Sequence, residues 1–327
     1  MKSLVEKFTN QLIDAIKIGD SVNLKKPNRS FDNITITGLG GSGIGGKIMS
    51  QLVQEQLSVP VIICSDYSIP DYIDQNSLVI VSSFSGNTEE TLTALAAAEI
   101  KGAEIACITS GGKLEAIAKE KGYNHIILPT ERSPRAMLTY SLVQQFYILN
   151  HYGFISNSFK KHVFTAIDLL NNSIEELKEK AKITASSFYN KTPVIYSEAS
   201  FEGVAIRMRQ QINENAKILC WHHVFPEMNH NELVGWAGGK NEYAVLFLRT
   251  SYDHPRSKVR MDISKKIISQ HTNVIHEINA LGNSIIEQAL YLILFGDWVS
   301  VYLAELNKVD SIEVNVIDYL KGELSKI

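Results

Sequence analysis

The chain has 327 residues, of which 45 % are hydrophobic and 20 % charged, an ordinary globular composition with room for two domains. A formal net charge of −3 provides no basic field, so we expect no nucleic-acid partner. The three cysteines, Cys64, Cys107 and Cys220, lie far apart in apolar segments, which predicts buried reduced thiols. The longest apolar stretches, such as Ala289 to Val299, have polar breaks and are shorter than the roughly 20 residues that span a bilayer. We therefore expect a cytoplasmic protein without a membrane span.

The N-terminal segment carries leucine and isoleucine at helical spacing among acidic residues, which predicts an amphipathic helix rather than a signal peptide. From Asn33 onward, short apolar segments alternate with helical patterns. Such alternation is typical of a parallel sheet with helices on both faces. In the first half we expect strands at 33–37, 59–64, 77–83, 103–109 and 125–129, helices from near Ile44, Thr88 and Lys113, and a longer helix over 134–151.

A polar segment from Gly153 to Phe159 separates this half from a second alternating half. In the second half we expect a helical stretch at 160–189, strands at 192–198, 216–221, 242–248 and 273–278, a helix from near Gly203, a long helix at 283–306 and a terminal helix from about 313. The predicted domains are therefore residues 1–152 and 153–327, each built on a parallel sheet.

Two loops rich in glycine and hydroxyl residues follow the first and third expected strands. The first reads GLGGSGIGGK over residues 38–47, and the second reads SSFSGNTEETL over residues 82–92. Glycines let the backbone turn sharply and let an anion approach, while N–H groups at a helix start point toward it. In the second loop Ser83, Ser85 and Thr88 add hydroxyl donors, and Thr88 is placed to cap the next helix. We interpret the two loops as one phosphate pocket.

The first loop also satisfies the dinucleotide fingerprint G-x-G-x-x-G through Gly38, Gly40 and Gly43, with Asp66 near the position of a ribose-binding acid. A dinucleotide has no need of the second loop, whereas a phosphomonoester has three acceptor oxygens and uses many donors. We favour the phosphomonoester and keep an NAD-dependent oxidoreductase as an alternative. Two turns without a ligand are a third interpretation, which the close grouping of hydroxyl residues disfavours.

Three further residues are candidates for chemistry. Arg135, in the first turn of an expected helix, could bind phosphate or an enediolate oxygen, or be an ordinary surface arginine. Glu214 ends a helical pattern before an expected buried strand, where it could act as a general base, although a helix-end Glu is more often solvated. His230, between two asparagines, could donate a proton near neutral pH or be a hydrogen-bonded loop residue.

A metal site is the remaining alternative. His222, His223, Glu227 and His230 lie close together, and the last two have the E-x-x-H spacing of carboxylate metal centres. The adjacent histidines would point to opposite faces of a strand, however. We therefore expect no metal and no cofactor.

The motifs GLGGSGIGG, SSFSGNTEET, ERSPRAML, NENAK and MNHNEL occur in this order, and through them the chain resembles the bifunctional phosphoglucose/phosphomannose isomerase family of SIS-domain sugar isomerases. The resemblance covers nearly the whole chain. It implies two SIS domains, each a three-layer α/β/α sandwich of flavodoxin-like type, and an active site at the domain interface of a homodimer. It further implies that the sugar phosphate is held by Gly41, Ser42, Ser83, Ser85 and Thr88, with Arg135 nearby.

The resemblance also implies a reaction. Glu214 would carry a proton between carbons 1 and 2 through a cis-enediolate whose oxyanions Arg135 stabilises, while His230, in its own subunit or across the dimer, assists ring opening. Lys321, in IDYLKGEL, is a second ring-opening candidate, although the preceding KVDSIEV departs from the proline-containing pattern of the family. The predicted function is interconversion of glucose 6-phosphate, and of mannose 6-phosphate, with fructose 6-phosphate, independent of metal. A non-catalytic sugar-phosphate-binding regulator on the same scaffold is the alternative.

Overall fold

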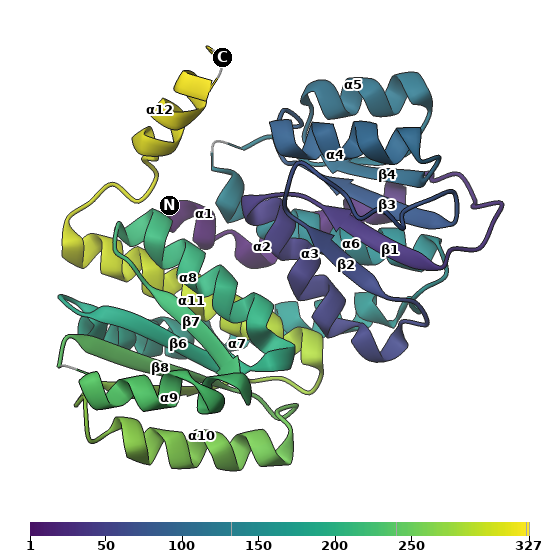
Figure 1. The fold of residues 1–327 in the computed structure, drawn as a ribbon. Helices are drawn as coiled ribbons and strands as arrows, with labels where there is room; N and C mark the ends of the chain where they lie inside the picture. The colour runs from purple at the N-terminus through teal and green to yellow at the C-terminus, as the bar shows by residue number, and fades with distance from the viewer. Residues whose placement is uncertain (132, 240, 325, 327) are drawn as a thin grey trace. The chain divides into compact units, whose positions relative to one another are not determined.

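The structure, a computed structural model, describes residues 1–131, 133–239, 241–324 and 326, and the chain divides into two compact units. The N-terminal unit comprises Glu6–Asn172 and Leu281–Leu290, and the C-terminal unit comprises Met1–Val5, Ser173–Ala280 and Tyr291–Ile327. Residues 153–172, which the sequence analysis assigns to the second domain, are grouped with the N-terminal unit. Each unit has its own sheet covered by helices (Figure 1).

The N-terminal unit contains a five-stranded parallel sheet in the order β2-β1-β3-β4-β5. Its strands are β1 (Asn33–Thr37), β2 (Val61–Cys64), β3 (Ser77–Ser82), β4 (Glu104–Thr109) and β5 (Asn124–Ile127). Its helices are α2 (Phe8–Ser21), α3 (Gly40–Leu52), η1 (Gln54–Gln56), α4 (Glu89–Ile100), α5 (Gly112–Lys121), η2 (Pro134–Met137) and α6 (Leu138–His151). Every residue of β1 and β3 is buried, as expected for central strands covered on both faces.

The C-terminal unit contains a four-stranded parallel sheet in the order β7-β6-β8-β9. Its strands are β6 (Thr192–Glu198), β7 (Trp221–Phe225), β8 (Tyr243–Arg249) and β9 (Ile275–Asn279). Its helices are α1 (Lys2–Val5), η3 (Ala199–Phe201), α8 (Glu202–Ala216), η4 (Glu227–His230), α9 (Glu232–Gly235), η5 (Trp236–Gly238), α10 (Pro255–Ile268) and α12 (Asn315–Leu324). Two long helices, α7 (Ser158–Phe188) and α11 (Ile285–Asn307), have residues in both units. Two parallel sheets flanked by helices confirm the predicted α/β class.

The strand predicted at 216–221 is wrong. Helix α8 continues to Ala216, and Lys217 then takes a left-handed backbone conformation with φ +59° that ends the helix. Leu219 is 84 % exposed, so this apolar run is a loop and not a buried strand. The strand follows directly as β7, and its two adjacent histidines conceal it from hydrophobic patterning.

The helix predicted from Ile44 begins earlier, at Gly40. Its glycines have low intrinsic helix propensity, but tertiary packing requires them because the helix lies close against the sheet. A Cβ added at Gly46 would lie 2.8 Å from Cγ2 of Ile36. Cys64 also differs from expectation, since it is only partly buried, with its Sγ 2.8 Å from the carbonyl oxygen of Ser68.

The apolar stretch from Ala289 to Val299 lies within α11, which confirms the long helix predicted at 283–306. Among the residues that the structure describes, α11 is the one helix with the length and composition needed to cross a membrane. Within its most apolar window, 83 % of the residues are buried inside the chain. Such burial is typical of a core helix.

Candidate active site

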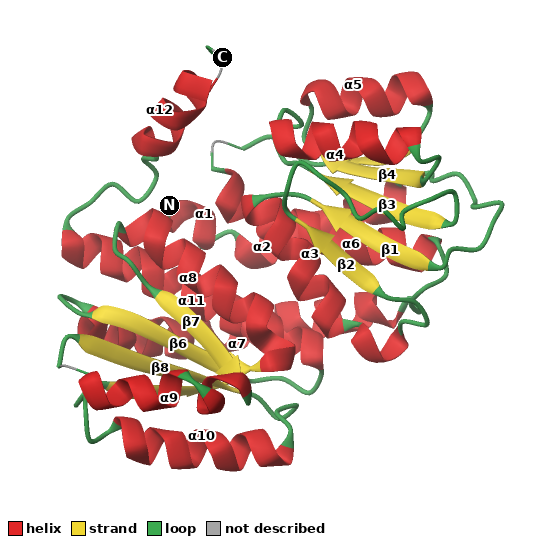
Figure 2. Cartoon of the chain, viewed as in Figure 1, coloured by secondary structure: helices red, strands yellow, loops and turns green. Residues whose placement is uncertain are grey.

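The two glycine-rich and hydroxyl-rich loops leave neighbouring strands at the same edge of the N-terminal sheet. Strands β1 and β3 pair in parallel with Thr37 opposite Val81, and β2 lies on the other side of β1 (Figure 2). The strand order therefore reverses between β1 and β3. In open α/β sheets, ligands bind beyond the carboxyl ends of the strands at such a switch point. Both loops thus lie where the fold class places a ligand.

The first loop packs its backbone tightly. A Cβ added at Gly43 would lie 2.3 Å from the carbonyl oxygen of Gly38, so a side chain there requires the loop to move. Leu39, the N-cap residue of α3, provides no side-chain cap bond. The first N–H groups of a helix lack intrahelical acceptors, and those of α3 belong to this loop. The start of α3 therefore offers backbone donors to an anion.

The second loop adds hydroxyl groups and is bonded to the first. The N–H of Phe84 donates to Oγ of Ser42 at 3.1 Å, and Oγ of Ser83 lies 2.9 Å from Oγ1 of Thr88. The N–H of Asn87 donates to Oγ of Ser85 at 3.3 Å. Thr88 is the N-cap residue of α4 as predicted, but its side chain makes no cap hydrogen bond. Its hydroxyl instead belongs to the same cluster as that of Ser83.

Arg135 lies beside the first loop. A Cβ added at Gly41 would be 3.8 Å from the Cα of Arg135 and 3.8 Å from the carbonyl oxygen of Pro134. Arg135 is 8 % exposed, so the alternative of a surface arginine is wrong. The first turn of the predicted helix is 3-10 in form, as η2, before α6 begins. Arg132 of the same motif lies outside the described residues.

Glu214 and His230 are positioned at opposite ends of β7. Glu214 is in the last turn of α8, and the crossover from β6 to the parallel strand β7 carries that end of the helix to the amino end of β7. His230 ends η4, which follows the carboxyl end of β7. Five strand residues span about 16 Å. Within this unit the two predicted catalytic residues are therefore not brought together.

The segment that leads into the helix of Lys321 is bonded to the end of α8, where Glu214 lies. Nζ of Lys217 donates to the carbonyl oxygen of Glu313 at 2.5 Å, and Nδ2 of Asn307 donates to that of Ala216 at 2.9 Å. These bonds attach the segment that leads into α12 to the end of α8. Lys321 itself is exposed on α12, which has no buried residue within its described range.

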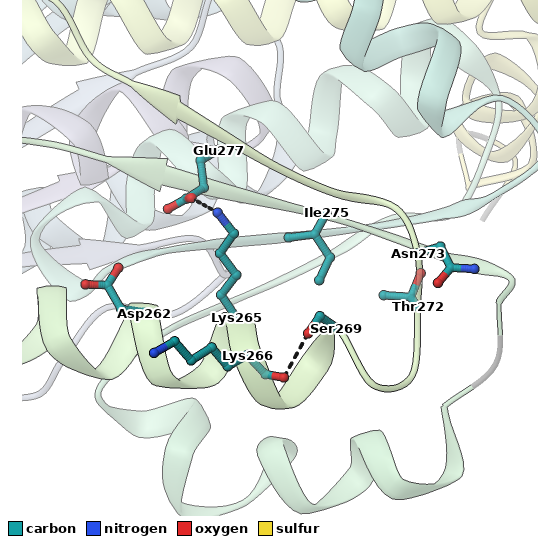
Figure 3. Close-up of a pocket in the computed structure, with 8 residues that line it drawn as sticks. All are labelled: Asp262, Lys265, Lys266, Ser269, Thr272, Asn273, Ile275 and Glu277. Carbon is teal, nitrogen blue, oxygen red and sulfur yellow. Dashed lines mark hydrogen bonds and ion pairs between the residues drawn. The ribbon is translucent and has the colours of Figure 1, made fainter.

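Two cavities of the C-terminal unit are lined by none of the predicted site residues. One of 720 Å³ runs between α10 and the edge strand β9, and Figure 3 shows Lys265 reaching Glu277 across it. The other, of 210 Å³, is lined by Trp221, Glu232, Trp236 and Tyr243 among others.

The histidines of β7 have separate surroundings, as expected from strand alternation. Nδ1 of His223 is 2.9 Å from Oε2 of Glu232, whereas Nε2 of His222 is 4.0 Å from Oε1 of Glu202. Among the described residues, no group of three or more His, Cys, Asp or Glu side chains could hold a metal ion.

His222 should make folding stability depend on pH. Burial, followed by the positive charge of Arg209, lowers the pKa of His222 to about 4 from 6.5. Between these values the unfolded chain binds the proton and the folded chain does not. The contribution of His222 to the free energy of unfolding is therefore fully present above pH 6.5. It is lost as the pH decreases to 4, which lowers the free energy of unfolding by up to about 3 kcal/mol. Urea unfolding across this range should show the decrease, and His222→Asn should lack this component.

Comparison with known proteins supports an isomerase. Residues 29–152 match the SIS domain family, and residues 177–324 match the bacterial phospho-glucose isomerase C-terminal SIS domain. A bifunctional phosphoglucose/phosphomannose isomerase from Caldicellulosiruptor bescii is 37 % identical over 333 residues, which cover 99 % of this chain and 98 % of the relative. The chain belongs to the bifunctional phosphoglucose/phosphomannose isomerase family. The member from Aquifex aeolicus is 36 % identical over 326 residues, covering 99 % and 98 % of the two chains.

Solved structures agree on the fold of this family. The C-terminal domain of glucosamine-fructose-6-phosphate aminotransferase from Francisella tularensis has a TM-score of 0.75 at 13 % identity, covering 94 % of this chain and 96 % of the other. Tagatose-6-phosphate ketose/aldose isomerase from Escherichia coli has a TM-score of 0.71 at 15 % identity, covering 95 % and 94 %. At this level of identity the similarity concerns the fold alone.

Proposed function

We infer that the chain is an aldose–ketose isomerase that interconverts glucose 6-phosphate and mannose 6-phosphate with fructose 6-phosphate. The observation that carries this function is the pair of donor-rich loops at the switch point between β1 and β3, in a chain whose near full-length relatives are isomerases of this name. We propose that it works as a cytoplasmic homodimer without a metal or cofactor.

The phosphate binds to the N-terminal unit in this proposal. Backbone donors at Gly41 and the hydroxyl groups of Ser42, Ser83, Ser85 and Thr88 surround its oxygens. The support is the bonding of the two loops to each other and the absence of a side-chain cap at the start of α4. A dianion with three acceptor oxygens uses such a set of donors, while the remote phosphate contacts orient the reacting carbons.

Glu214 transfers the proton in this proposal, and Arg135 stabilises the intermediate. Once the ring is open, Glu214 removes the proton from carbon 2 of the aldose and the electron pair moves to the carbonyl oxygen at carbon 1, which forms the cis-enediolate. The hydroxyl proton at carbon 2 then passes to the oxygen at carbon 1. Return of the proton to carbon 1 and formation of the carbonyl at carbon 2 produce the ketose. Arg135, buried beside the first loop, stabilises the negative oxygens of the intermediate. Rotation of the sugar about the bond next to carbon 2 allows either aldose epimer to form.

Ring opening needs an acid that protonates the ring oxygen. The placement of Glu214 and His230 at opposite ends of β7 favours a dimer in which His230 serves the site of the partner subunit. Lys321 follows a segment bonded to the end of α8, which favours a role beside Glu214 of its own chain.

The test of this function is an isomerisation assay in deuterium oxide. The purified chain should convert glucose 6-phosphate and mannose 6-phosphate to fructose 6-phosphate. Solvent deuterium should appear by NMR at carbon 1 of the fructose 6-phosphate and at carbon 2 of the aldose formed in the reverse reaction. Activity should persist in the presence of a chelator. Binding of fructose 6-phosphate without conversion or exchange would instead identify a non-catalytic regulator.

Removal of one loop hydroxyl should weaken phosphate binding. Ser83→Ala deletes a buried hydroxyl that bonds to Thr88, and loss of a hydrogen bond to a charged ligand corresponds to about a 10- to 100-fold increase in KM. Inhibition by inorganic phosphate should weaken by the same factor, with kcat little changed. Ser50→Ala, which removes a hydroxyl bonded to a carbonyl within α3, is the matched control. Unaltered phosphate inhibition in Ser83→Ala would contradict the assignment.

A further inference from the structure

The segment that carries His230 is held on both sides while the imidazole remains exposed. Before it, Met228 is fully buried in the core of the C-terminal unit, and Nδ2 of Asn229 donates to Oγ of Ser264 at 2.8 Å. After it, Oδ1 of Asn231 accepts the N–H of Glu232 at 2.6 Å and starts α9. The chain on both sides of His230 is therefore held in place, while the imidazole itself is accessible from outside the unit.

The Glu232 side chain bonds the segment that carries His230 to two strands of the sheet. Its Oε1 accepts the hydroxyl of Tyr196 from β6, and its Oε2 lies 2.9 Å from Nδ1 of His223 on β7. The indole N–H of Trp236, in η5, donates to the Tyr196 hydroxyl at 3.0 Å. One carboxylate, two residues after His230, therefore ties α9 to the central strand β6 and to the edge strand β7, and Trp236 ties η5 to the same tyrosine.

The tyrosine in this network remains a donor at every working pH. Tyr196 is fully buried, and this burial, followed by the nearby charge of Glu232, raises the pKa of its hydroxyl well above the usual value. A buried hydroxyl that keeps its proton donates to the carboxylate in a fixed direction. The Glu232 side chain is thus oriented by the sheet and not by solvent.

We propose that Glu232 is a positioning residue for ring opening, which fixes the direction in which His230 is presented to the sugar phosphate. The inference rests on the proposed function, because it assigns Glu232 an effect only through the imidazole of His230. A displacement of about 1 Å at such a group can lower the rate about 100-fold. Ring opening can be measured separately from isomerisation, because opening and reclosure exchange the α and β anomers of glucose 6-phosphate.

The first experiment measures anomer exchange and isomerisation by NMR for the wild type, Glu232→Gln, His230→Gln and the double variant. Glu232→Gln should slow anomer exchange about 10- to 100-fold, with unchanged inhibition by inorganic phosphate. The double variant should be no slower than His230→Gln alone, because residues that act through one group are not additive. Tyr196→Phe should show a smaller loss of the same kind and keeps the test valid if Glu232→Gln does not fold.

Glu277→Gln is the matched control. Glu277 is also a partly buried carboxylate of the C-terminal unit and has two cationic partners, Arg249 and Lys265 (Figure 3). It lies on β9, the edge strand at the other side of the sheet from β7. The Glu277→Gln variant should exchange the anomers of glucose 6-phosphate at the wild-type rate. Full additivity in the double variant, or wild-type exchange in folded Glu232→Gln and Tyr196→Phe, overturns the inference. A wild type that neither exchanges anomers nor isomerises overturns the proposed function instead.

Discussion

Glu214→Gln should lower kcat about 100- to 10,000-fold, since this is the usual contribution of a general acid or base. The amide has nearly the shape of the carboxylate but cannot accept the proton from carbon 2. Incorporation of deuterium at carbon 1 of fructose 6-phosphate and at carbon 2 of the aldose should disappear together with turnover. Inhibition by inorganic phosphate should remain, because the phosphate loops belong to the other unit. Steady-state kinetics and NMR in deuterium oxide measure both quantities.

A control at the same end of the C-terminal unit is available. Glu313 is partly exposed and lies beside Lys217, as part of the segment bonded to the end of α8. Glu313→Gln should retain turnover within about a factor of two, as most surface substitutions do. Normal turnover by Glu214→Gln in the presence of a chelator would refute the proposed mechanism.

Two inactive variants should restore activity when they share a dimer. If His230 serves the site of the partner, a heterodimer of Glu214→Gln with His230→Gln has one site with both changes and one site with neither. It should regain about half of the wild-type activity, while each variant homodimer stays nearly inactive. The variants can be co-expressed with different affinity tags, and the doubly tagged species isolated and assayed.

An inactive heterodimer would contradict a site shared between the subunits. If His230 acts in its own chain, each site of the heterodimer lacks one residue and no activity returns. A wild-type chain that is monomeric by light scattering and fully active would also contradict the shared site. A heterodimer of wild type with the double variant Glu214→Gln/His230→Gln is the control. If His230 serves the partner, each of its sites lacks one residue and it should be inactive, whereas if His230 acts in its own chain the wild-type site should keep about half of the activity.

Much of the N-terminal unit is predictable from local pattern. Strands β1 and β3 are short apolar runs followed at once by glycine or serine, and the alternation with helices indicates a parallel sheet. The phosphate loops are recognisable for the same reason, since glycines and hydroxyl groups between a strand and a helix form a local motif. The helix start at Gly40 escapes this pattern, because packing against Ile36 outweighs the low propensity of glycine.

The C-terminal unit is less predictable where polar residues enter the sheet. Strand β7 contains His222 and His223, while the apolar run before it is an exposed loop, so the pattern points to the wrong segment. Helix α10, over Pro255–Ile268, is also absent from the sequence prediction, because charged residues interrupt its apolar spacing. The role of Glu232 depends on partners from β6 and β7, and sequence spacing does not indicate such partners.

By itself, the sequence determined the α/β class, the two donor-rich loops and the candidates Arg135, Glu214 and His230, because each depends on residues that are neighbours along the chain. Only the tertiary structure decided that β1 and β3 are adjacent, so that their loops meet, and that Glu214 and His230 lie at opposite ends of β7. The physical reason is that strand order and crossover direction depend on packing between distant segments, which local pattern does not encode.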